Sequence, residues 1–252
     1  MNEFAVMAQL GILAARPGAL IAAAPAFGGA FAPPPVRIGL AVVIAVLLVP
    51  AVPPQSFATT AGMGLVIVRE MAIGVLMALA LRAIIAGAEL GGHLTGSQLM
   101  LSYGSVVDPQ GGVRNNLIAN LYGNLALMTF LAMNGHHALL RALASSYTAI
   151  PIGEGGIGTS LAGTVVQLLG IVFVLGARLA APIVVVMLLV EVGTAIMARV
   201  APSLNLLAVA PPIRIAVGLL ATAAMAPLVP SVVRAASAGI GELALRAAGA
   251  FR

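Results

Sequence analysis

The sequence carries so few charged side chains that water cannot be its main solvent. It has 252 residues, of which 12 are arginine, none is lysine and 7 are acidic, so charged residues make up 8% and hydrophobic residues 61%. An ordinary soluble domain is about 25% charged. These totals exclude a soluble enzyme, a nucleic-acid-binding module and a disordered regulator. The chain is therefore expected to contact membrane lipid, other protein or both.

The cysteine count and the charge distribution exclude further kinds of site. There is no cysteine, which excludes a disulfide framework, a thiolate metal site and a cysteine nucleophile. The sequence pI is about 11.1, but the arginines are scattered singly and form no cluster that could follow a phosphate backbone. No nucleic-acid partner is expected.

Apolar segments divide the chain into about six candidate helices. A membrane-spanning helix needs roughly 20 mostly apolar residues, and the candidates are short or broken by proline and charge. The segments are 4–27 (interrupted at Arg16 and Pro17), 38–49, 62–85, 117–133, 161–190 and 215–233. The sequence therefore predicts an all-α, polytopic membrane protein of five or six broken hydrophobic helices.

The chain is expected to form one domain, 1–252, with three distinctive parts. Residues 34–61 form a proline-rich connection and a short helix, and the prolines at 33–35 predict an extended turn. Residues 102–116 form a glycine-rich loop. Residues 234–252 form a basic tail that is predicted to lie as a helix at the cytoplasmic interface, because its arginines favour a cytoplasmic C-terminus. A cleaved signal peptide begins with basic residues, whereas this chain has the acidic Glu3 there, so a cleaved signal peptide is not expected.

The familiar catalytic constellations are missing. There is no H-E-x-x-H motif, His136 and His137 are sequence neighbours that cannot face one site on a helix, and His93 stands alone. No G-x-S-x-G motif surrounds Ser145 and Ser146. Without lysine there is no phosphate-binding loop of the ATPase type. We expect no metal, no cofactor and no enzyme activity.

Small residues recur at helical spacing between residues 87 and 96. Gly87 and Gly91 form one four-residue step, and Gly92 and Gly96 form another. Such tracks let helices approach closely. They predict close helix packing, either within this chain or against a partner subunit.

A break in the apolar pattern follows these glycines. Asp108-Pro109 favours a turn, and glycines relax the limits on φ. Irregular backbone in a membrane protein is tolerated where it lines a cavity or is buried in protein. The segment is predicted to be either an ordinary connection or a loop that lines or plugs a pore. Its residues are Ser102, Tyr103, Gly104, Ser105, Val106, Val107, Asp108, Pro109, Gly111 and Gly112.

Six charged residues lie within or beside apolar segments. Charges inside a membrane cost several kcal/mol unless they are paired, so these residues are candidates for interhelical ion pairs and, as the weaker alternative, for a proton relay. Arg69 and Glu70 are sequence neighbours that point apart on a helix, so each needs another partner. The six are Arg69, Glu70, Glu89, Arg178, Glu191 and Arg199.

Several short stretches, taken in order, resemble one family, the FliR family of flagellar export-gate proteins, which has virulence counterparts in type III secretion injectisomes. The NGHHALL segment at 134–140 and the RVAPSLN segment at 199–205 are moderately specific together. The other stretches are RP at 16–17, PAF at 25–27, PVRI at 35–38, REMAIG at 69–74, DP at 108–109, SY at 146–147 before PIG at 151–153, and AP at 181–182. The similarity spans nearly the whole chain and is weakest after Arg234.

The resemblance implies a function that the residues alone do not. In this family one FliR-like subunit joins FliP-like and FliQ-like subunits in an export gate and contacts an FlhB-like subunit. The gate passes unfolded proteins across the inner membrane within the flagellar basal body. Its helices pack as hairpins in an assembly raised partly out of the bilayer. Residues 102–116 match the family's loop that closes the pore.

Three alternatives stay open from the sequence. One is an export gate of an injectisome rather than a flagellum. Another is a stand-alone secondary transporter with Glu70 or Glu89 as the coupling site, although paired inverted halves are not evident. The last is an intramembrane hydrolase that uses Ser145 or Ser146 with His136 or His137.

Overall fold

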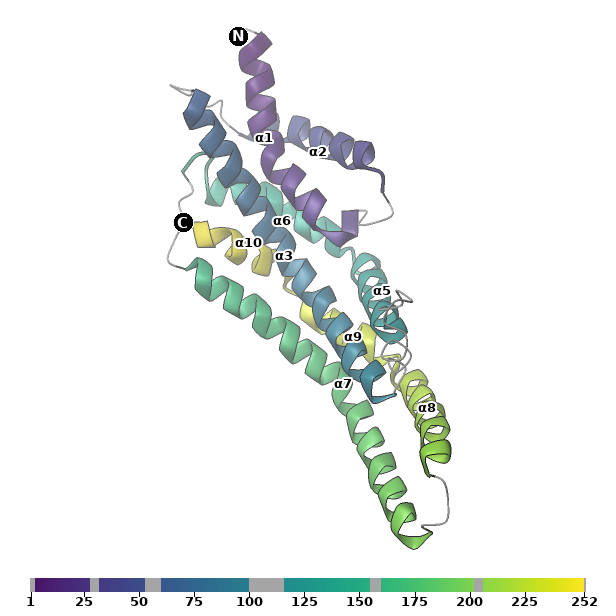
Figure 1. The fold of residues 1–252 in the computed structure, drawn as a ribbon. Coiled ribbons are helices and arrows are strands. Elements are labelled where there is room, and N and C mark those ends of the chain that lie inside the picture. The colour runs from purple at the N-terminus through teal and green to yellow at the C-terminus, as the bar shows by residue number, and fades with distance from the viewer. Residues whose placement is uncertain are drawn as a thin grey trace. The chain divides into compact units, whose positions relative to one another are not determined.

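The computed structural model describes residues 3–27, 32–52, 60–99, 116–154, 160–201 and 206–251, and none of these residues lies in a strand. The all-α fold predicted from the apolar segments is confirmed (Figure 1). The helices are α1 (Glu3–Ala23), α2 (Pro34–Leu48), α3 (Thr60–Gln98), α5 (Leu117–Ala132), α6 (Gly135–Ala149), α7 (Leu161–Val200), α8 (Leu206–Met225), α9 (Leu228–Ser237) and α10 (Ile240–Ala248). Short 3-10 turns follow α1, α2 and α10 at Pro25–Phe27, Val49–Ala51 and Gly249–Phe251.

Two of these helices are long and apolar enough to cross a membrane. They are α3 over Gly62–Gln98 and all of α7. Two bent pairs would also qualify if each pair were one span: α5 with α6, bent by 68°, and α8 with α9, bent by 46°. By length and composition, the described residues therefore hold two candidate spans, or up to four.

At three places the helix boundaries near a proline differ from those expected from the sequence. Helix α1 continues through Arg16 and Pro17, where an interruption was predicted. Pro33 is extended, but Pro34 begins α2, because the first helical position needs no backbone donor. The predicted segment 215–233 is instead divided, since α8 ends before Pro227 and α9 begins after it.

Helix lengths also differ from the predicted segments. Helix α3 continues past residue 85 to Gln98, and α7 continues past residue 190 to Val200. Helix α6 was not predicted, because its histidines and serines lower its hydropathy. Its buried side chains nevertheless recur at helical spacing, a signal that a search for one-sided periodicity would have found. They are Leu139, Ala142, Leu143, Ser146 and Tyr147.

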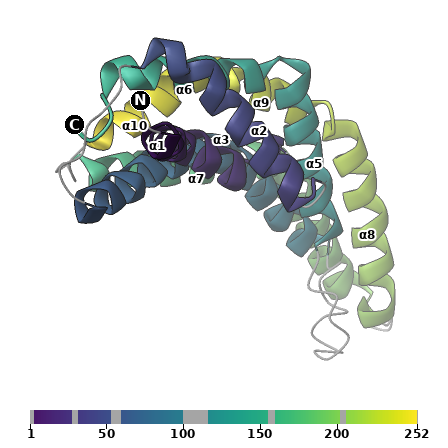
Figure 2. The same ribbon diagram turned by 90° about the horizontal axis from the view of Figure 1, so that it is seen from above.

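The chain divides into two compact units. Unit 1 contains Met1–Ala83, Phe130–Leu169 and Ala236–Arg252, and unit 2 contains Ile84–Thr129 and Gly170–Ala235. In unit 1, α2 packs along α1 and α10 packs on α6 (Figures 1 and 2). Contacts far apart in sequence therefore build unit 1 from three separate stretches of chain.

The tail contains a helix, as expected, and this helix buries part of its surface within unit 1. Helix α10 packs on α6 of the same unit. Its exposed charges, Glu242 and Arg246, form an i,i+4 pair at 3.4 Å. The residues that it buries are Ile240, Ala244, Ala247 and Ala248. The place of this tail at the cytoplasmic interface stays a prediction from the sequence.

A buried arginine cluster as the candidate functional site

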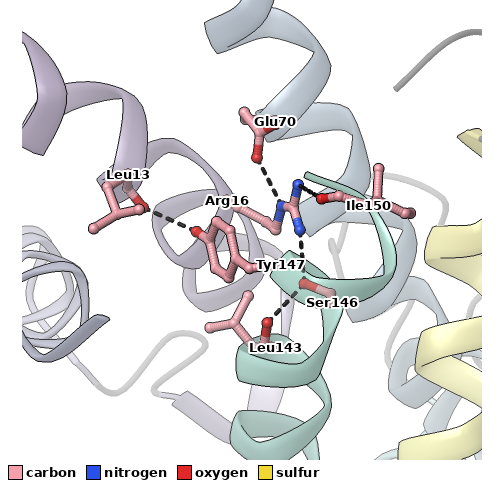
Figure 3. A network of polar contacts seen from close by, with 7 residues as sticks. All are labelled: Leu13, Arg16, Glu70, Leu143, Ser146, Tyr147 and Ile150. Carbon is pink, nitrogen blue, oxygen red and sulfur yellow. Dashed lines mark hydrogen bonds and ion pairs between the residues drawn. The ribbon is translucent and has the colours of Figure 1, made fainter. Parts of the chain in front are cut away.

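A completely buried arginine joins three helices of unit 1. Arg16 on α1 has 0% exposed surface. Its Nε donates to Glu70 Oε2 on α3 at 2.7 Å, and its Nη1 donates to Ser146 Oγ on α6 at 2.8 Å. Its Nη2 donates to the carbonyl oxygen of Ile150, directly after α6, at 3.1 Å (Figure 3). All three guanidinium nitrogens therefore have acceptors.

Tyr147 and Ser146 complete this cluster. The Tyr147 ring lies under the guanidinium, with 4.2 Å between Arg16 Cζ and the ring centroid. The Tyr147 hydroxyl donates to the Leu13 carbonyl of α1 at 3.0 Å, and Ser146 Oγ donates to the Leu143 carbonyl at 2.7 Å (Figure 3). We call these seven residues, Leu13, Arg16, Glu70, Leu143, Ser146, Tyr147 and Ile150, the Arg16 cluster.

A glycine explains why the arginine and the glutamate can meet. Gly74 lies one turn after Glu70 on the same face of α3. A Cβ atom at Gly74 would collide with the backbone carbonyl of Arg16 and lie 3.0 Å from the Cβ of Ala19. The missing side chain therefore lets the backbone of α1 approach α3, which brings the guanidinium within reach of the carboxylate.

The physical cost of this arrangement indicates what it does. Moving an ion from water into a protein interior costs several kcal/mol even after relaxation, and only good geometry with further hydrogen bonds repays it. Arg16 and Glu70 are 0% and 1% exposed and have that geometry. We therefore expect the cluster to act as an interhelical clamp that holds α1, α3 and α6 in one register.

The cluster does not have the geometry of the hydrolase or transporter alternatives. A serine nucleophile needs a base to take its proton, whereas the Ser146 hydroxyl donates to a backbone carbonyl. Glu70 is buried in an ion pair with Arg16 rather than open to a coupling ion. No group of three potential metal-ligating side chains occurs within the described ranges.

Arg16 was not among the site residues expected from the sequence. Together with Pro17 it was expected to interrupt the first apolar segment. Arg16 could have been selected by the rule that a charge within an apolar segment needs a partner. The same reasoning that selected Glu70 applies to Arg16.

The six charged residues singled out in the sequence do not gather in one place. Glu70 lies in the Arg16 cluster, and Glu191 on α7 pairs with Arg214 on α8 at 2.6 Å in unit 2. Arg69 is half-buried, and Glu89 is exposed with its carboxylate lying against Gly123 of α5. Arg178 and Arg199 are exposed on α7.

The four glycines singled out at helical spacing pack against this chain's own helices in unit 2. A Cβ atom at Gly87 would lie 2.8 Å from Leu175 Cβ of α7, and one at Gly91 would lie 2.8 Å from Leu179 Cβ. On the side facing α5, a Cβ at Gly92 would lie 2.5 Å from Ala119 Cα, and one at Gly96 would collide with Asn116. These positions are therefore filled from within the chain.

The predicted pore-plug loop, Ser102 to Gly112, lies outside the residues that the structure describes. Its role remains a prediction from the sequence and the family resemblance.

Long apolar helices, a polar cluster buried between α1, α3 and α6, and glycine-mediated helix contacts define an all-α, polytopic membrane protein. The sequence model of the family described as "Bacterial export proteins, family 1" matches residues 7–239. The chain therefore belongs to this family, whose members include the FliR proteins, and the resemblance noted in the sequence is confirmed.

Curated relatives agree with this assignment. The chain is 31% identical to the flagellar biosynthetic protein FliR of Pectobacterium carotovorum over 84% of its own length and 82% of the relative's. It is 27% identical to FliR of Escherichia coli K12, with 84% and 81% covered. It is 29% identical to FliR of Caulobacter vibrioides, with 87% and 90% covered.

Proposed function

We propose that the chain is a structural pore subunit of a flagellar type III export gate, which conducts unfolded flagellar proteins across the inner membrane. The proposal starts from the family and from relatives that are named as flagellar biosynthetic proteins. In this proposal the chain acts together with FliP-like, FliQ-like and FlhB-like subunits. It performs no chemical step.

The observation that carries the proposal is the length of α7 over which large apolar side chains are exposed. Large apolar side chains are exposed along almost the whole helix. They are Val165, Val166, Leu169, Phe173, Val174, Val185, Leu188, Leu189, Val192, Ile196, Met197 and Val200. At 1.5 Å per residue, the first and last of them are about 52 Å apart along the helix.

That length exceeds what a bilayer can cover. The hydrocarbon core of a membrane is about 30 Å thick, and tilting a helix by about 20°, the average for membrane helices, shortens its projection by only a few ångströms. Lipid alone therefore cannot cover the whole exposed length of α7. Partner subunits of an export gate would cover the remainder.

The exposed charge on α7 supports protein rather than lipid as part of that cover. Arg178 is exposed and lies between Val174 and Val185 on a helix of high mean hydropathy. An arginine facing hydrocarbon costs several kcal/mol. A partner subunit or a water-filled lumen would remove that cost.

The direct test is a clean deletion of the gene, with the wild-type gene returned as the control. We expect deletion cells to lack flagellar filaments under the microscope and to secrete no filament protein. Motile, filament-bearing deletion cells would overturn the flagellar proposal. Loss of an injectisome's secreted proteins in such cells would assign the chain to that apparatus instead.

The proposed plug has a separate test. Shortening the segment from Ser102 to Gly112 should make the assembled gate leak small ions, because a closing loop would no longer fill the lumen. The control is the same gate with the full loop. If the shortened gate stays as tight as the wild type, the loop is an ordinary connection.

A further inference from the structure

Helix α1 contains a residue that should weaken it. Pro17 has no backbone N–H, so the bond that residue 17 of an α-helix would donate to the carbonyl of residue 13 cannot form. The carbonyl that loses its donor belongs to Leu13, whose residue is only 1% exposed. Buried carbonyl groups without a partner are rare because water cannot satisfy them.

A side chain from another helix satisfies this carbonyl. The Tyr147 hydroxyl of α6 donates to the Leu13 carbonyl oxygen at 3.0 Å, which is an ordinary hydrogen-bond length. The two residues are 134 positions apart in the sequence. The donor that proline removes from α1 is therefore supplied by the tertiary structure.

The same tyrosine also contacts the next functional group along α1. Its ring lies 4.2 Å from Arg16 Cζ, within the range of a cation–π contact. The arginine immediately precedes the proline, and its backbone carbonyl lies against Gly74 of α3. Any bend of α1 at Pro17 would therefore disturb both the approach to α3 and the ion pair.

We propose that Tyr147 is a positioning residue whose hydroxyl replaces the hydrogen bond that Pro17 removes from α1, and so latches α1 at a proline hinge and holds Arg16 on Glu70. Helix α6 thereby decides whether α1 is rigid at Pro17. This inference concerns the chain itself and does not depend on whether the chain lines a pore.

Two substitutions, made singly and together, should show whether the Tyr147 hydroxyl replaces the missing donor. Tyr147→Phe keeps the ring over the guanidinium but leaves the Leu13 carbonyl without a donor. Pro17→Ala returns an N–H to α1, and alanine is the best helix former. The hydroxyl should therefore matter only while proline is present.

The experiment measures hydrogen–deuterium exchange of α1 amides in the full-length chain purified from membranes in detergent. Losing a hydrogen bond to a buried acceptor costs about 1–3 kcal/mol, so Tyr147→Phe should speed opening of α1 around residues 13–20 about fivefold or more. In the Pro17→Ala background the same substitution should change exchange by less than about twofold, since the helix then supplies the bond itself.

Tyr122→Phe serves as the matched control. Tyr122 is also a buried tyrosine, but it lies on α5 in unit 2. Its substitution should leave α1 exchange unchanged in either background. If Pro17→Ala fails to accumulate, a comparison of Tyr147→Phe with Tyr122→Phe in the native background still tests the latch.

Two results would overturn the proposal. One is an equal effect of Tyr147→Phe with proline and with alanine at residue 17, which would make the hydroxyl's role unrelated to the missing donor. The other is unchanged α1 exchange in Tyr147→Phe, which would mean that the helix does not need the bond.

Discussion

Helix α3 meets its neighbours by different means along its length. In its first half, within unit 1, Glu70 forms a buried ion pair with Arg16, and Gly74 admits the backbone of α1. In its second half, within unit 2, the contacts at Gly87 and Gly92 bring α7 and α5 close through missing side chains. The first contact combines a glycine with a buried pair of complementary charges, whereas the second depends on shape alone.

The difference has consequences for specificity and for cost. The arginine that pairs with a buried carboxylate can be replaced by few other residues, because an unpaired charge in the interior is severely unfavourable. A glycine contact tolerates any neighbour of suitable shape but tolerates no added side chain. Substitutions along α3 should therefore fail for electrostatic as well as steric reasons in unit 1, and for steric reasons in unit 2.

The largest effect is expected from Glu70→Ala. Removing one member of a buried ion pair typically costs 3–5 kcal/mol, about the range we expect here, because Arg16 would stay buried without its carboxylate. The thermal midpoint of the purified chain and its abundance in membranes should both fall sharply.

A double substitution sharpens that test. Arg16→Met together with Glu70→Leu removes both charges and keeps apolar volume, so it should recover much of the lost stability. If Glu70→Ala is as stable as the wild type, the Arg16 cluster is not the clamp of unit 1.

A steric effect is expected from Gly92→Ala. The new methyl group would meet the backbone of α5, 2.5 Å from Ala119 Cα and 2.7 Å from the Ile118 carbonyl oxygen. Overpacking of this kind costs about 1–3 kcal/mol, which should appear as a lower thermal midpoint.

Gly170→Ala on α7 is the matched control, because nothing lies within 4 Å of a Cβ atom at that position. It should be neutral or stabilising by up to about 1 kcal/mol, since alanine favours the helix. Equal effects of the two substitutions would show that α3 and α5 can separate without cost.

A smaller effect is expected from Glu191→Gln. The ion pair with Arg214 is short at 2.6 Å, but the Glu191 side chain is 45% exposed. Exposed pairs contribute roughly 0–1 kcal/mol. The thermal midpoint should shift by far less than in Glu70→Ala, and a comparable loss would contradict the distinction drawn between buried and exposed pairs.

The smallest effect is expected from Glu242→Gln on α10. Its partner Arg246 is one turn away, and both side chains are more than three-quarters exposed. Pairs of this kind contribute only a few tenths of a kcal/mol, and roughly 0.1 M salt screens them. Thermal midpoints at low and high salt should barely differ from the wild type, whereas a clear loss would indicate that the tail pair stabilises the α6–α10 contact.

Much of the fold could be predicted from the chain, but of the candidate site only Glu70 was selected, without its partner. Apolar segments correctly predicted α-helices around α2, α3, α5 and α7, and they failed at α6 because its polar residues obscured a one-sided pattern. The need of Glu70 for a partner could be predicted, whereas Arg16 could not be chosen over the other arginines. Their separation by 54 residues leaves no local signal of the pairing.

The sequence by itself determined three things. Sparse charge showed that the chain contacts lipid or protein rather than mainly water, long apolar segments showed that it is helical, and ordered motifs showed its family. The tertiary structure decided which helix each glycine faces and which arginine neutralises Glu70. It also decided that α1 continues through Pro17. The physical reason is the same each time. A missing donor, a buried charge or the space left by an absent side chain is matched by a group that only the folded chain brings near. Tyr147, which contacts Leu13, is 134 residues away in the sequence.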